Sequence, residues 1–329
     1  MPDRDAATLS LINPLGAALE HYERALVDVL TTRAKKVECT RIDEPSANGG
    51  SRVRWLREYI RAVRTAGKAK TGSVIVLWPV LGYLDATLLR LLGVRHAKVI
   101  MHDPTPLVRA IGYGRFSKLI ARYVGSTEYI THSRSAYREV SRVVHESHVR
   151  YAPHPIKARA QEHPRDRRRV IRVLGQYKPS RDLSALVQIA EDERLSGFTC
   201  EIVGRGWPSV PGWTTDARFV PEAEMDRLIL SSSSVVIPYS RFYQSGIAIR
   251  ALELGCPVVG PSDSSLADIY GADAENLTHD GRWGDAVLFA TQQSAAEIAR
   301  TRAEYTRRVE QSALVYIGEP TAARAGRRR

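Results

Sequence analysis

Short apolar runs alternate with longer amphipathic segments in the first half of the chain, as parallel strands joined by crossover helices do. The apolar runs predict strands at Thr8–Ile12, Lys36–Arg41, Val74–Trp78, Lys98–Met101, Glu128–His132 and Val149–Ala152. Apolar residues at helical spacing predict helices at Ala17–Thr32, Asp85–Leu92, Phe116–Val124 and Ser135–Val144. A second α/β series runs to about Phe289, and Ser294–Tyr316 predicts one long helix. The pattern therefore predicts an α/β protein with two parallel sheets.

The length of 329 residues suits two domains of ordinary size. The segment 155–169 is polar, charged and proline-bearing, which predicts a linker. We expect a first domain at 1–158, a linker at 159–169, a second domain at 170–293, a terminal helix at 294–318 and a basic tail at 319–329.

Composition favours a soluble protein, since 43% of the residues are hydrophobic and 26% are charged. No apolar run reaches the roughly 18 to 20 residues that a membrane-spanning helix needs. The first residues lack the pattern of a signal peptide. Cys39, Cys200 and Cys256 lie in or beside apolar runs, so we expect reduced, buried thiols and a cytoplasmic protein.

The formal net charge of +12 favours an anionic partner. Basic residues crowd the segment 52–70, and Trp55, Leu56, Tyr59, Ile60 and Val63 recur between them at helical spacing. This pattern predicts a basic amphipathic helix at an anionic membrane surface, so that the protein is peripheral to the membrane. Alternatively, the apolar stripe packs on the domain core and the arginines are solvated. A nucleic-acid partner is disfavoured because no nucleic-acid-binding motif occurs and the charge is spread over both halves.

The segment Val235–Val259 indicates a ligand. It predicts a strand, a polar loop, a helix that begins at Ser245-Gly246, and a second strand. In parallel sheets ligands bind at the carboxyl ends of strands, and a helix N-terminus favours anions. A phosphate-bearing ligand is the leading prediction.

The same segment resembles the donor-binding segment of GT-B glycosyltransferases that use nucleotide sugars. The resemblance rests on Pro238-Tyr239, on Gln244-Ser245-Gly246 and on the final Gly255-Cys256-Pro257-Val258-Val259. Upstream, Val173–Arg181 is similar to the strand, glycine and basic loop of that family, Glu201–Gly206 to its strand ending in Gly-x-Gly, and Arg218–Pro221 to its nucleobase-side strand. The likeness covers roughly residues 170–290 and points to the retaining group-1-like members.

The resemblance implies two Rossmann-like domains that face each other across a cleft, with a C-terminal helix that crosses back to the first domain. It implies an enzyme of class EC 2.4, a hexosyltransferase-type protein that moves a sugar from a nucleotide diphosphate sugar to a lipid, polysaccharide or protein acceptor. Neither a cofactor nor a metal is expected, because no Asp-x-Asp ends a strand and His145 and His148 lack a third ligand. A sugar-nucleotide epimerase on the same fold and a non-catalytic nucleotide-sugar-binding homologue remain alternatives.

Candidate site residues follow from position and resemblance. The donor diphosphate is assigned to Lys178, Arg181, Ser245, Gly246 and Gly16, and the base and ribose to Gly204, Arg218, Val220, Tyr239 and Glu253. The donor sugar loop contains Tyr243 and Gln244. For catalysis the candidates are His102, Asp103 and Asp85, any of which could serve as a general base in an inverting enzyme. In a retaining enzyme, the resemblance implies that polar groups here instead hold the sugar and the acceptor. His132 and His154 also end strands, with a functional or a structural role.

One departure from the family concerns the ribose. The common pattern has two glutamates eight positions apart, and Phe242 and Arg250 occupy those places here. A subgroup with Gln-Ser-Gly in this loop also lacks the pair, and the chain resembles that subgroup. Glu253, one helical turn later, could replace the second glutamate or could be a solvated helix carboxylate.

Overall fold

The chain forms two compact units, Met1–Pro155 with Arg308–Arg329, and Ile156–Arg307. The computed structural model describes residues 8–34, 36–45, 49–68, 73–94, 96–106, 110–123, 127–157, 168–240 and 242–317. Most of the predicted linker, the whole basic tail and Lys70 lie outside these residues.

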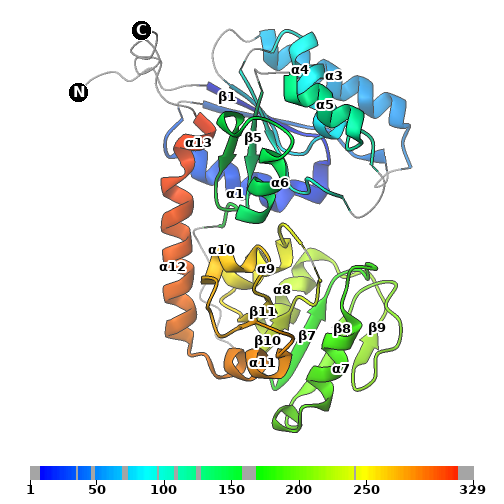
Figure 1. The fold of residues 1–329 in the computed structure, drawn as a ribbon, viewed down its shortest axis with the longest axis vertical. Coiled ribbons are helices and arrows are strands. Elements are labelled where there is room, and N and C mark those ends of the chain that lie inside the picture. The colour runs from blue at the N-terminus through cyan, green and yellow to red at the C-terminus, as the bar shows by residue number, and fades with distance from the viewer. Residues whose placement is uncertain are drawn as a thin grey trace, which may run out of the picture. The chain divides into compact units, whose positions relative to one another are not determined.

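The first unit is built on a six-stranded parallel sheet (Figure 1). Its strands are β1 (Thr8–Asn13), β2 (Lys36–Arg41), β3 (Ser73–Val76), β4 (Ala97–Ile100), β5 (Thr127–Thr131) and β6 (Val149–Tyr151), in the order β2-β1-β3-β4-β5-β6. All six predicted strands are confirmed, with ends that shift by one or two residues.

Alternation along the strands separates two hydrophobic layers in this unit. Val74 and Val76 of β3 face α3 (Arg52–Lys68), α4 (Asp85–Leu91), α5 (Arg115–Tyr123) and α6 (Arg134–Ser141). Ile75 and Leu77 face α1 (Glu20–Thr31) and α13 (Ala313–Ile317). The C-terminal helix therefore returns to the first unit, where Tyr316 is buried in the core.

The predicted long C-terminal helix is two helices. α12 (Ala295–Gln311) and α13 are separated at Ser312. The Ser312 hydroxyl donates to the carbonyl oxygen of Val309 at 2.7 Å, a local bond that competes with continuous helix. Similarly, the first turn of the helix predicted at Ala17–Thr32 is a short 3-10 helix, Gly16–Leu19, whereas α4 begins at Asp85 as predicted and is preceded by a 3-10 turn at Gly82–Leu84.

Helix α3 is not the membrane helix that its sequence predicts. Tyr59 and Val63 are fully buried against the first sheet, with Trp55 and Leu56 packed beside them. The Trp55 indole donates to the carbonyl oxygen of Pro14 at 2.7 Å. The alternative is correct: the stripe packs on the core, and Arg52, Arg54, Arg57, Arg61 and Arg64 are exposed.

The second unit contains another six-stranded parallel sheet. Its strands are β7 (Val170–Leu174), β8 (Thr199–Val203), β9 (Thr214–Asp216), β10 (Ser234–Val236), β11 (Val258–Pro261) and β12 (Leu277–Thr278), in the order β12-β11-β10-β7-β8-β9. The helices are α7 (Leu183–Glu191), α8 (Glu222–Leu230), α9 (Gly246–Glu253), α10 (Leu266–Tyr270) and α11 (Trp283–Gln292), with a 3-10 turn at Glu193–Leu195. Helices α7 and α11 cover one face, against Ile171 and Val173.

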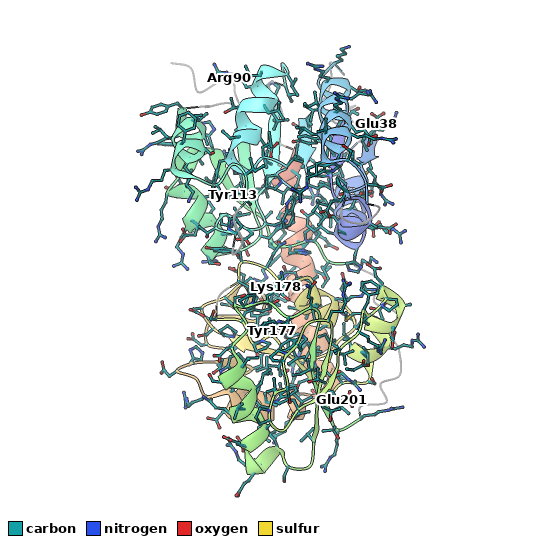
Figure 2. The ribbon with its side chains drawn as sticks, turned by 90° about the vertical axis from the view of Figure 1, so that its right-hand side faces the viewer. Glu38, Arg90, Tyr113, Tyr177, Lys178 and Glu201 are labelled. Atoms are coloured by element: carbon teal, nitrogen blue, oxygen red, sulfur yellow. The ribbon has the colours of Figure 1, made fainter. Side chains whose placement is uncertain are left out.

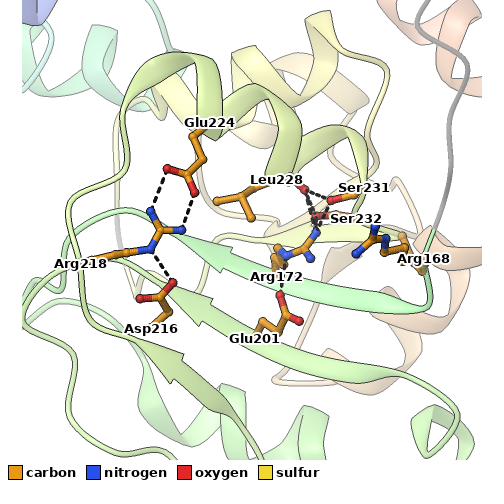
Figure 3. A network of polar contacts seen from close by, with 10 residues as sticks. Arg168, Arg172, Glu201, Asp216, Arg218, Glu224, Leu228, Ser231 and Ser232 are labelled. Carbon is orange, nitrogen blue, oxygen red and sulfur yellow. Dashed lines mark hydrogen bonds and ion pairs between the residues drawn. The ribbon is translucent and has the colours of Figure 1, made fainter.

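A buried arginine joins the other face of this sheet to α8 (Figure 3). Arg172 of β7 donates to Glu201 Oε2 of β8 at 2.7 Å and to the carbonyl oxygen of Leu228 at 2.9 Å. The same guanidinium reaches the hydroxyls of Ser231 and Ser232. The serine run after α8 therefore supplies acceptors for a cation inside the unit.

The cysteine prediction is correct for two residues and wrong for one. All three thiols are free, and Cys200 and Cys256 are buried, but Cys39 is exposed. Cys39 lies on β2, a strand at the edge of the first sheet whose residues are mostly exposed, so an apolar neighbourhood in sequence does not bury it. Across the described ranges, none of the helices has both the length and the apolar character needed to cross a membrane.

The loops after β7 and β8 approach each other closely at Gly175 and Gly204. Gly204 has φ +157°, and a Cβ atom added there would lie 2.1 Å from the carbonyl oxygen of Gly175. That oxygen also accepts from the Trp207 indole at 2.8 Å, so it is fixed in place. Glycine at 204 is required by space and by backbone conformation.

We expect Gly204→Ala to lower the free energy of unfolding of this unit by about 2 kcal/mol or more, because the methyl group overlaps fixed backbone. Urea denaturation followed by tryptophan fluorescence measures the change. Gly246→Ala is the matched control, since an added Cβ atom meets nothing within 4 Å there. Equal stability of the two variants would contradict the role of Gly204.

Candidate functional site

The loops after β7 and β10 meet at the centre of the second sheet. The strand order places β8 and β9 on one side of β7 and β10 to β12 on the other, which makes the β7/β10 pair a topological switch point. Arg181 and Tyr239 form an isolated antiparallel bridge between the two loops. The amide of Asp182 donates to Pro238 O at 2.6 Å, and the amide of Ser240 donates to Ser180 O at 3.1 Å. Ligands of parallel α/β sheets bind at such a position.

Arg181 is buried between two aromatic rings. Its guanidinium carbon lies 4.4 Å from the ring centre of Tyr239 and 4.7 Å from that of Trp207, and the residue is 6% exposed. Nη2 donates to the carbonyl oxygens of Leu174 and Gln176 at 3.0 and 3.2 Å. Burial lowers the pKa of Arg181, and the neighbouring Tyr239 opposes the shift.

Two donor atoms of this guanidinium are unsatisfied. Nε and Nη1 of Arg181 are buried without a hydrogen-bond partner, and none of the ion pairs recorded among the described residues includes Arg181. A buried cation without a carboxylate is costly. An anion in contact with Nε and Nη1 would supply both an acceptor and a counter-charge.

The start of α9 lies beside this guanidinium. A Cβ atom added to Gly175 would be 3.0 Å from Ile247 Cδ1 and 3.5 Å from Arg181 Nη2, so these three residues are neighbours. Ser245 caps the helix by accepting from the Ala248 amide at 3.2 Å. Gly246 is exposed, with open space where its side chain would be. The N–H groups of the first turn and the positive end of the helix dipole thus favour an anion near Arg181.

Other predicted donor residues lie in the same two loops. Lys178 is exposed in the loop after β7, next to the half-buried Tyr177 (Figure 2). Gln244 has a buried Oε1 atom without a hydrogen-bond partner, and Tyr243 beside it is buried. The structure therefore brings Lys178, Arg181, Tyr239, Gln244 and Ser245 onto two connected loops.

Arg218 is engaged elsewhere, contrary to its assignment to the nucleotide base. Its guanidinium donates to both carboxylate oxygens of Glu224, at 2.5 and 2.8 Å, and to Asp216 at 2.6 Å (Figure 3). The hydrogen bonds to Glu224 and Asp216 raise the pKa of Arg218. Arg218 thus joins β9 to α8, and Val220, half-buried in the loop between them, follows it.

The position of the missing second glutamate holds an ion pair. Arg250 of α9 donates to both carboxylate oxygens of Asp226 on α8 and lies 3.6 Å from Glu222. Glu253, the possible substitute, is 4% exposed and accepts from the Lys157 amide at 2.9 Å. It is therefore not a solvated helix carboxylate, and its bond to the main chain favours a structural role over a ribose contact.

The first unit contains a buried group of histidines at the carboxyl ends of β4, β5 and β6. The rings of His102, His132 and His154 surround Tyr22, with ring centres 4.9 to 5.4 Å from it. His132 lies 5.3 Å from His102 and 5.2 Å from His154, and Trp78 stacks on His102 at 4.9 Å. Within the described ranges, no group of three or more His, Cys, Asp or Glu side chains is placed to hold a metal ion.

Hydrogen bonds assign the proton positions in this group. His132 Nδ1 lies 2.9 Å from the carbonyl oxygen of Ala152, which can only accept, so Nδ1 carries the proton. Nε2 then accepts from the Tyr22 hydroxyl at 2.8 Å. Likewise His102 Nε2 donates to Leu77 O at 2.7 Å. Burial lowers the pKa of His132, and burial lowers that of His154 to about 3. The two imidazoles are therefore neutral at pH 7.

Among the three predicted bases, Asp103 is the best placed. His102 is 2% exposed and held by Leu77, and Asp85 is fully buried. Asp85 accepts from the Tyr59 hydroxyl at 2.9 Å and from the Leu81 amide at 2.7 Å, while burial raises its pKa to about 7. These placements favour structural roles for His102 and Asp85. Asp103 is half-buried directly after β4.

Gly16 is also placed unfavourably for its predicted phosphate contact. It begins a 3-10 helix with φ +48°, and a Cβ atom there would lie 2.7 Å from Asp43 Oδ1. A carboxylate so close repels a phosphate. Glycine at 16 instead suits the turn, where Asn13 Nδ2 donates to its carbonyl oxygen at 2.9 Å.

Two residues central to these arrangements were absent from the predicted site. Trp207 follows the Gly-x-Gly after β8 and covers the Arg181 guanidinium. Its position in a strand-end loop is the signal that could have identified it. Tyr22 falls within the helix predicted at Ala17–Thr32, on its apolar face, and nothing in the periodicity separates it from a core residue.

Comparison with known proteins relates the chain to solved structures only. No protein-family model and no curated protein sequence matches it. Anabaena HepE in complex with UDP and glucose matches with a TM-score of 0.58 and 11% identity over 95% of each chain. An E. coli trehalose-6-phosphate structure bound with UDP-2-fluoro glucose matches with a TM-score of 0.62 and 9% identity, over 93% of this chain and 96% of that one. Sucrose-phosphate synthase from Thermosynechococcus elongatus matches with 0.59 and 13% identity over 97% of each. The likeness confirms the predicted GT-B fold.

The buried histidines predict acid sensitivity of the first unit. The folded pKa values of His132 and His154 lie below the unfolded value of about 6.5, so the unfolded chain takes up protons first as the pH falls. Stability is therefore complete above about pH 6.5 and is lost as the pH falls toward the folded values. His154, with a folded pKa of about 3, should contribute a loss of about 2 kcal/mol between pH 6.5 and 5, and His132 adds to the loss in the same direction.

His154→Gln should make the free energy of unfolding less dependent on pH, while His145→Gln, at an exposed position, should leave the pH dependence unchanged. Urea denaturation of the three proteins between pH 5 and 7.5 measures the slopes. Identical slopes for all three would rule out the histidine cluster as the source.

Proposed function

We propose that the chain is a glycosyltransferase that uses a nucleotide diphosphate sugar as donor. The observation that carries this proposal is the Arg181 guanidinium, which is buried at the switch point of the second sheet near the start of α9 and has two donor atoms, Nε and Nη1, without a hydrogen-bond partner. A diphosphate fits this site, because it accepts hydrogen bonds from a guanidinium and from helix N–H groups at once.

The same groups would assist the reaction. Breaking the bond between sugar and phosphate develops negative charge on the leaving diphosphate. A cation and N–H groups that are already in place stabilise this charge more in the transition state than in the ground state. Arg181 and the first turn of α9 take this role, and Lys178 supplies a second, exposed cation. Tyr243 and Gln244 lie next to Ser245 in the chain, where they would contact the donor sugar.

Solved structures of the same fold support the choice of donor. Anabaena HepE holds UDP and glucose, and the E. coli structure holds UDP-2-fluoro glucose. In this chain Arg250 and Arg218 are engaged by carboxylates, so we assign neither to the nucleotide. Gly204 and Tyr239 remain the best placed of the predicted base and ribose residues.

We further propose that Asp103 acts on the acceptor side, that the enzyme transfers a hexosyl group without a metal ion, and that it works in the cytoplasm. The acceptor is a lipid, a polysaccharide or a protein. Incubation with radiolabelled UDP-, GDP-, ADP- and TDP-sugars and a lipid and glycan extract tests the activity directly. Label that stays on the nucleotide as an altered sugar would indicate an epimerase, and nucleotide binding without turnover would indicate a binding protein.

Arg181→Met should separate ligand binding from stability. Removing an unpaired buried cation should leave the free energy of unfolding unchanged or raise it. Binding of the preferred nucleoside diphosphate should weaken by about 1.5 to 3 kcal/mol, or roughly ten- to a hundredfold, with little change for the nucleoside. Calorimetry and urea denaturation measure the two effects.

Arg172→Met is the matched control, because Arg172 is buried in the same unit but paired with Glu201. It should lower stability and leave nucleotide affinity unchanged in the folded protein. If Arg181→Met weakens nucleoside and nucleoside diphosphate equally, Arg181 does not bind the diphosphate.

Asp103→Asn should lower kcat by about a hundredfold or more, as expected for a general base, and leave nucleotide affinity unchanged. Asp85→Asn should instead lower stability, since Asp85 is held inside the first unit. Transfer assays and calorimetry on both variants decide between the two roles. A normal kcat for Asp103→Asn would remove Asp103 from the reaction.

A further inference from the structure

Helix α5 exposes three of its four large apolar side chains and buries small ones. Phe116 is 74% exposed, Leu119 53% and Tyr123 76%, whereas Ser117 and Ala121 face the core. A helix that served only to cover the sheet would have the opposite arrangement. The large residues must therefore gain something outside the unit to offset their contact with water.

The exposed residues form one stripe. At about 100° per residue, Phe116, Leu119 and Tyr123 lie within an arc of roughly 60° on the helix. Ile111, just before the helix, is 73% exposed. These four residues, named the α5 patch below, are half of the eight exposed large hydrophobic residues in the described parts of the chain.

The charge on α5 itself has one sign. Helix α5 contains Arg115, Lys118 and Arg122 and no acidic residue. Arg115 and Arg122 are exposed and lie along one side of the apolar stripe, and Lys118 lies over the Tyr83 ring at 5.8 Å. Helices α3 and α4 cover the same face of the first sheet (Figure 1), and they add the exposed arginines of α3 and Arg90 at the outer end of α4 (Figure 2).

We propose that the α5 patch docks the protein on an anionic lipid surface. Phe116, Leu119 and Tyr123 enter the boundary between headgroups and acyl chains, and Arg115 and Arg122 contact the anionic headgroups. Tyr123 suits this depth because its ring is apolar and its hydroxyl remains hydrated. The proposed membrane surface is therefore on α5 and not on α3, because the apolar stripe of α3 is already buried in the first unit.

Electrostatic repulsion makes a second copy of the chain an unfavourable partner for the α5 patch. A twofold interface places the same patch on both sides, so Arg115 and Arg122 of one copy would approach the same residues of the other. Repulsion between these cations would oppose the apolar contact. An anionic surface satisfies the apolar and the charged residues together.

The test is sedimentation of the full chain with vesicles of phosphatidylcholine, alone or mixed with phosphatidylglycerol. The wild-type protein should bind the mixed vesicles and not the neutral ones, and added salt should weaken binding by screening the charges. The triple variant F116S/L119S/Y123S should bind at least tenfold more weakly. Because all three side chains are exposed, its circular dichroism and melting temperature should be unchanged.

Matched variants control for general hydrophobicity and charge. V53S and L314S alter exposed apolar residues on α3 and α13 and should bind as wild type does. R115E/R122E should lose binding, while R57E/R61E, with the same change of charge on α3, should lose much less. Equal losses for the two charge variants would indicate a diffuse electrostatic attraction and overturn the assignment to α5.

A depth probe gives a second readout. In a C39S background, which removes the exposed thiol, L119C is labelled with a polarity-sensitive fluorophore. Its emission should shift to the blue on mixed vesicles and not on neutral ones. Two other results overturn the proposal: wild-type protein that stays in the supernatant at low salt, and a concentration-dependent dimer that the triple variant abolishes.

Discussion

The burial of the Arg181 guanidinium without a carboxylate is the constraint on which the candidate site depends. A cation in the interior is expensive unless a counter-charge and hydrogen bonds compensate it. Two aromatic faces and two carbonyl oxygens compensate Arg181 only in part, because Nε and Nη1 have no acceptor. Gly204 and Gly175 bring the strand-end loops close enough to form this enclosure. The second unit thus keeps a fixed positive charge at the place where parallel sheets bind ligands.

Three other arginines of the same unit differ from Arg181, because each of them is paired with a carboxylate. Arg172 meets Glu201, Arg218 meets Glu224 and Asp216, and Arg250 meets Asp226. Each of these three joins elements of the unit, and each has its charge balanced by protein. Arg181 alone among the four lacks such a carboxylate in the described residues, which separates a binding role from a structural one.

Most of the fold could be predicted from the sequence, because the apolar pattern of the strands and the residues at turns and helix starts are local features of the chain. A strand that is buried on both faces is apolar along its whole length. Val74 to Leu77 form such a run, with Val74 and Val76 in one hydrophobic layer and Ile75 and Leu77 in the other. Turns and helix starts such as Ser245-Gly246 depend on residues next to each other in the chain. These signals need no knowledge of which element packs against which.

The errors concern partners that are distant in sequence. The apolar stripe of α3 could equally have met a membrane or the sheet, and only the position of Asp85 and Pro14 shows that Tyr59 and Trp55 face inward. For Arg218, the sequence contains both a family position and two nearby carboxylates, and the fold brings the carboxylates within reach. Side-chain size along α5 likewise does not reveal that Ser117 and Ala121 face the core. Helical periodicity identifies a stripe, but the surrounding elements determine what the stripe contacts.

The ion pair at Arg250 links the departure from the family to the geometry of the unit. A glutamate at this position would face Asp226 and Glu222 on α8, and three carboxylates so close would repel one another. Arg250 and the acidic residues of α8 therefore depend on each other, and reversing one alone would leave unbalanced charge between the helices. Glu253 cannot simply replace the missing carboxylate, because its Oε1 already accepts from the Lys157 amide. If the chain binds a nucleotide as proposed, its affinity comes mainly from the diphosphate end, where Arg181 and the start of α9 lie together, and less from the ribose.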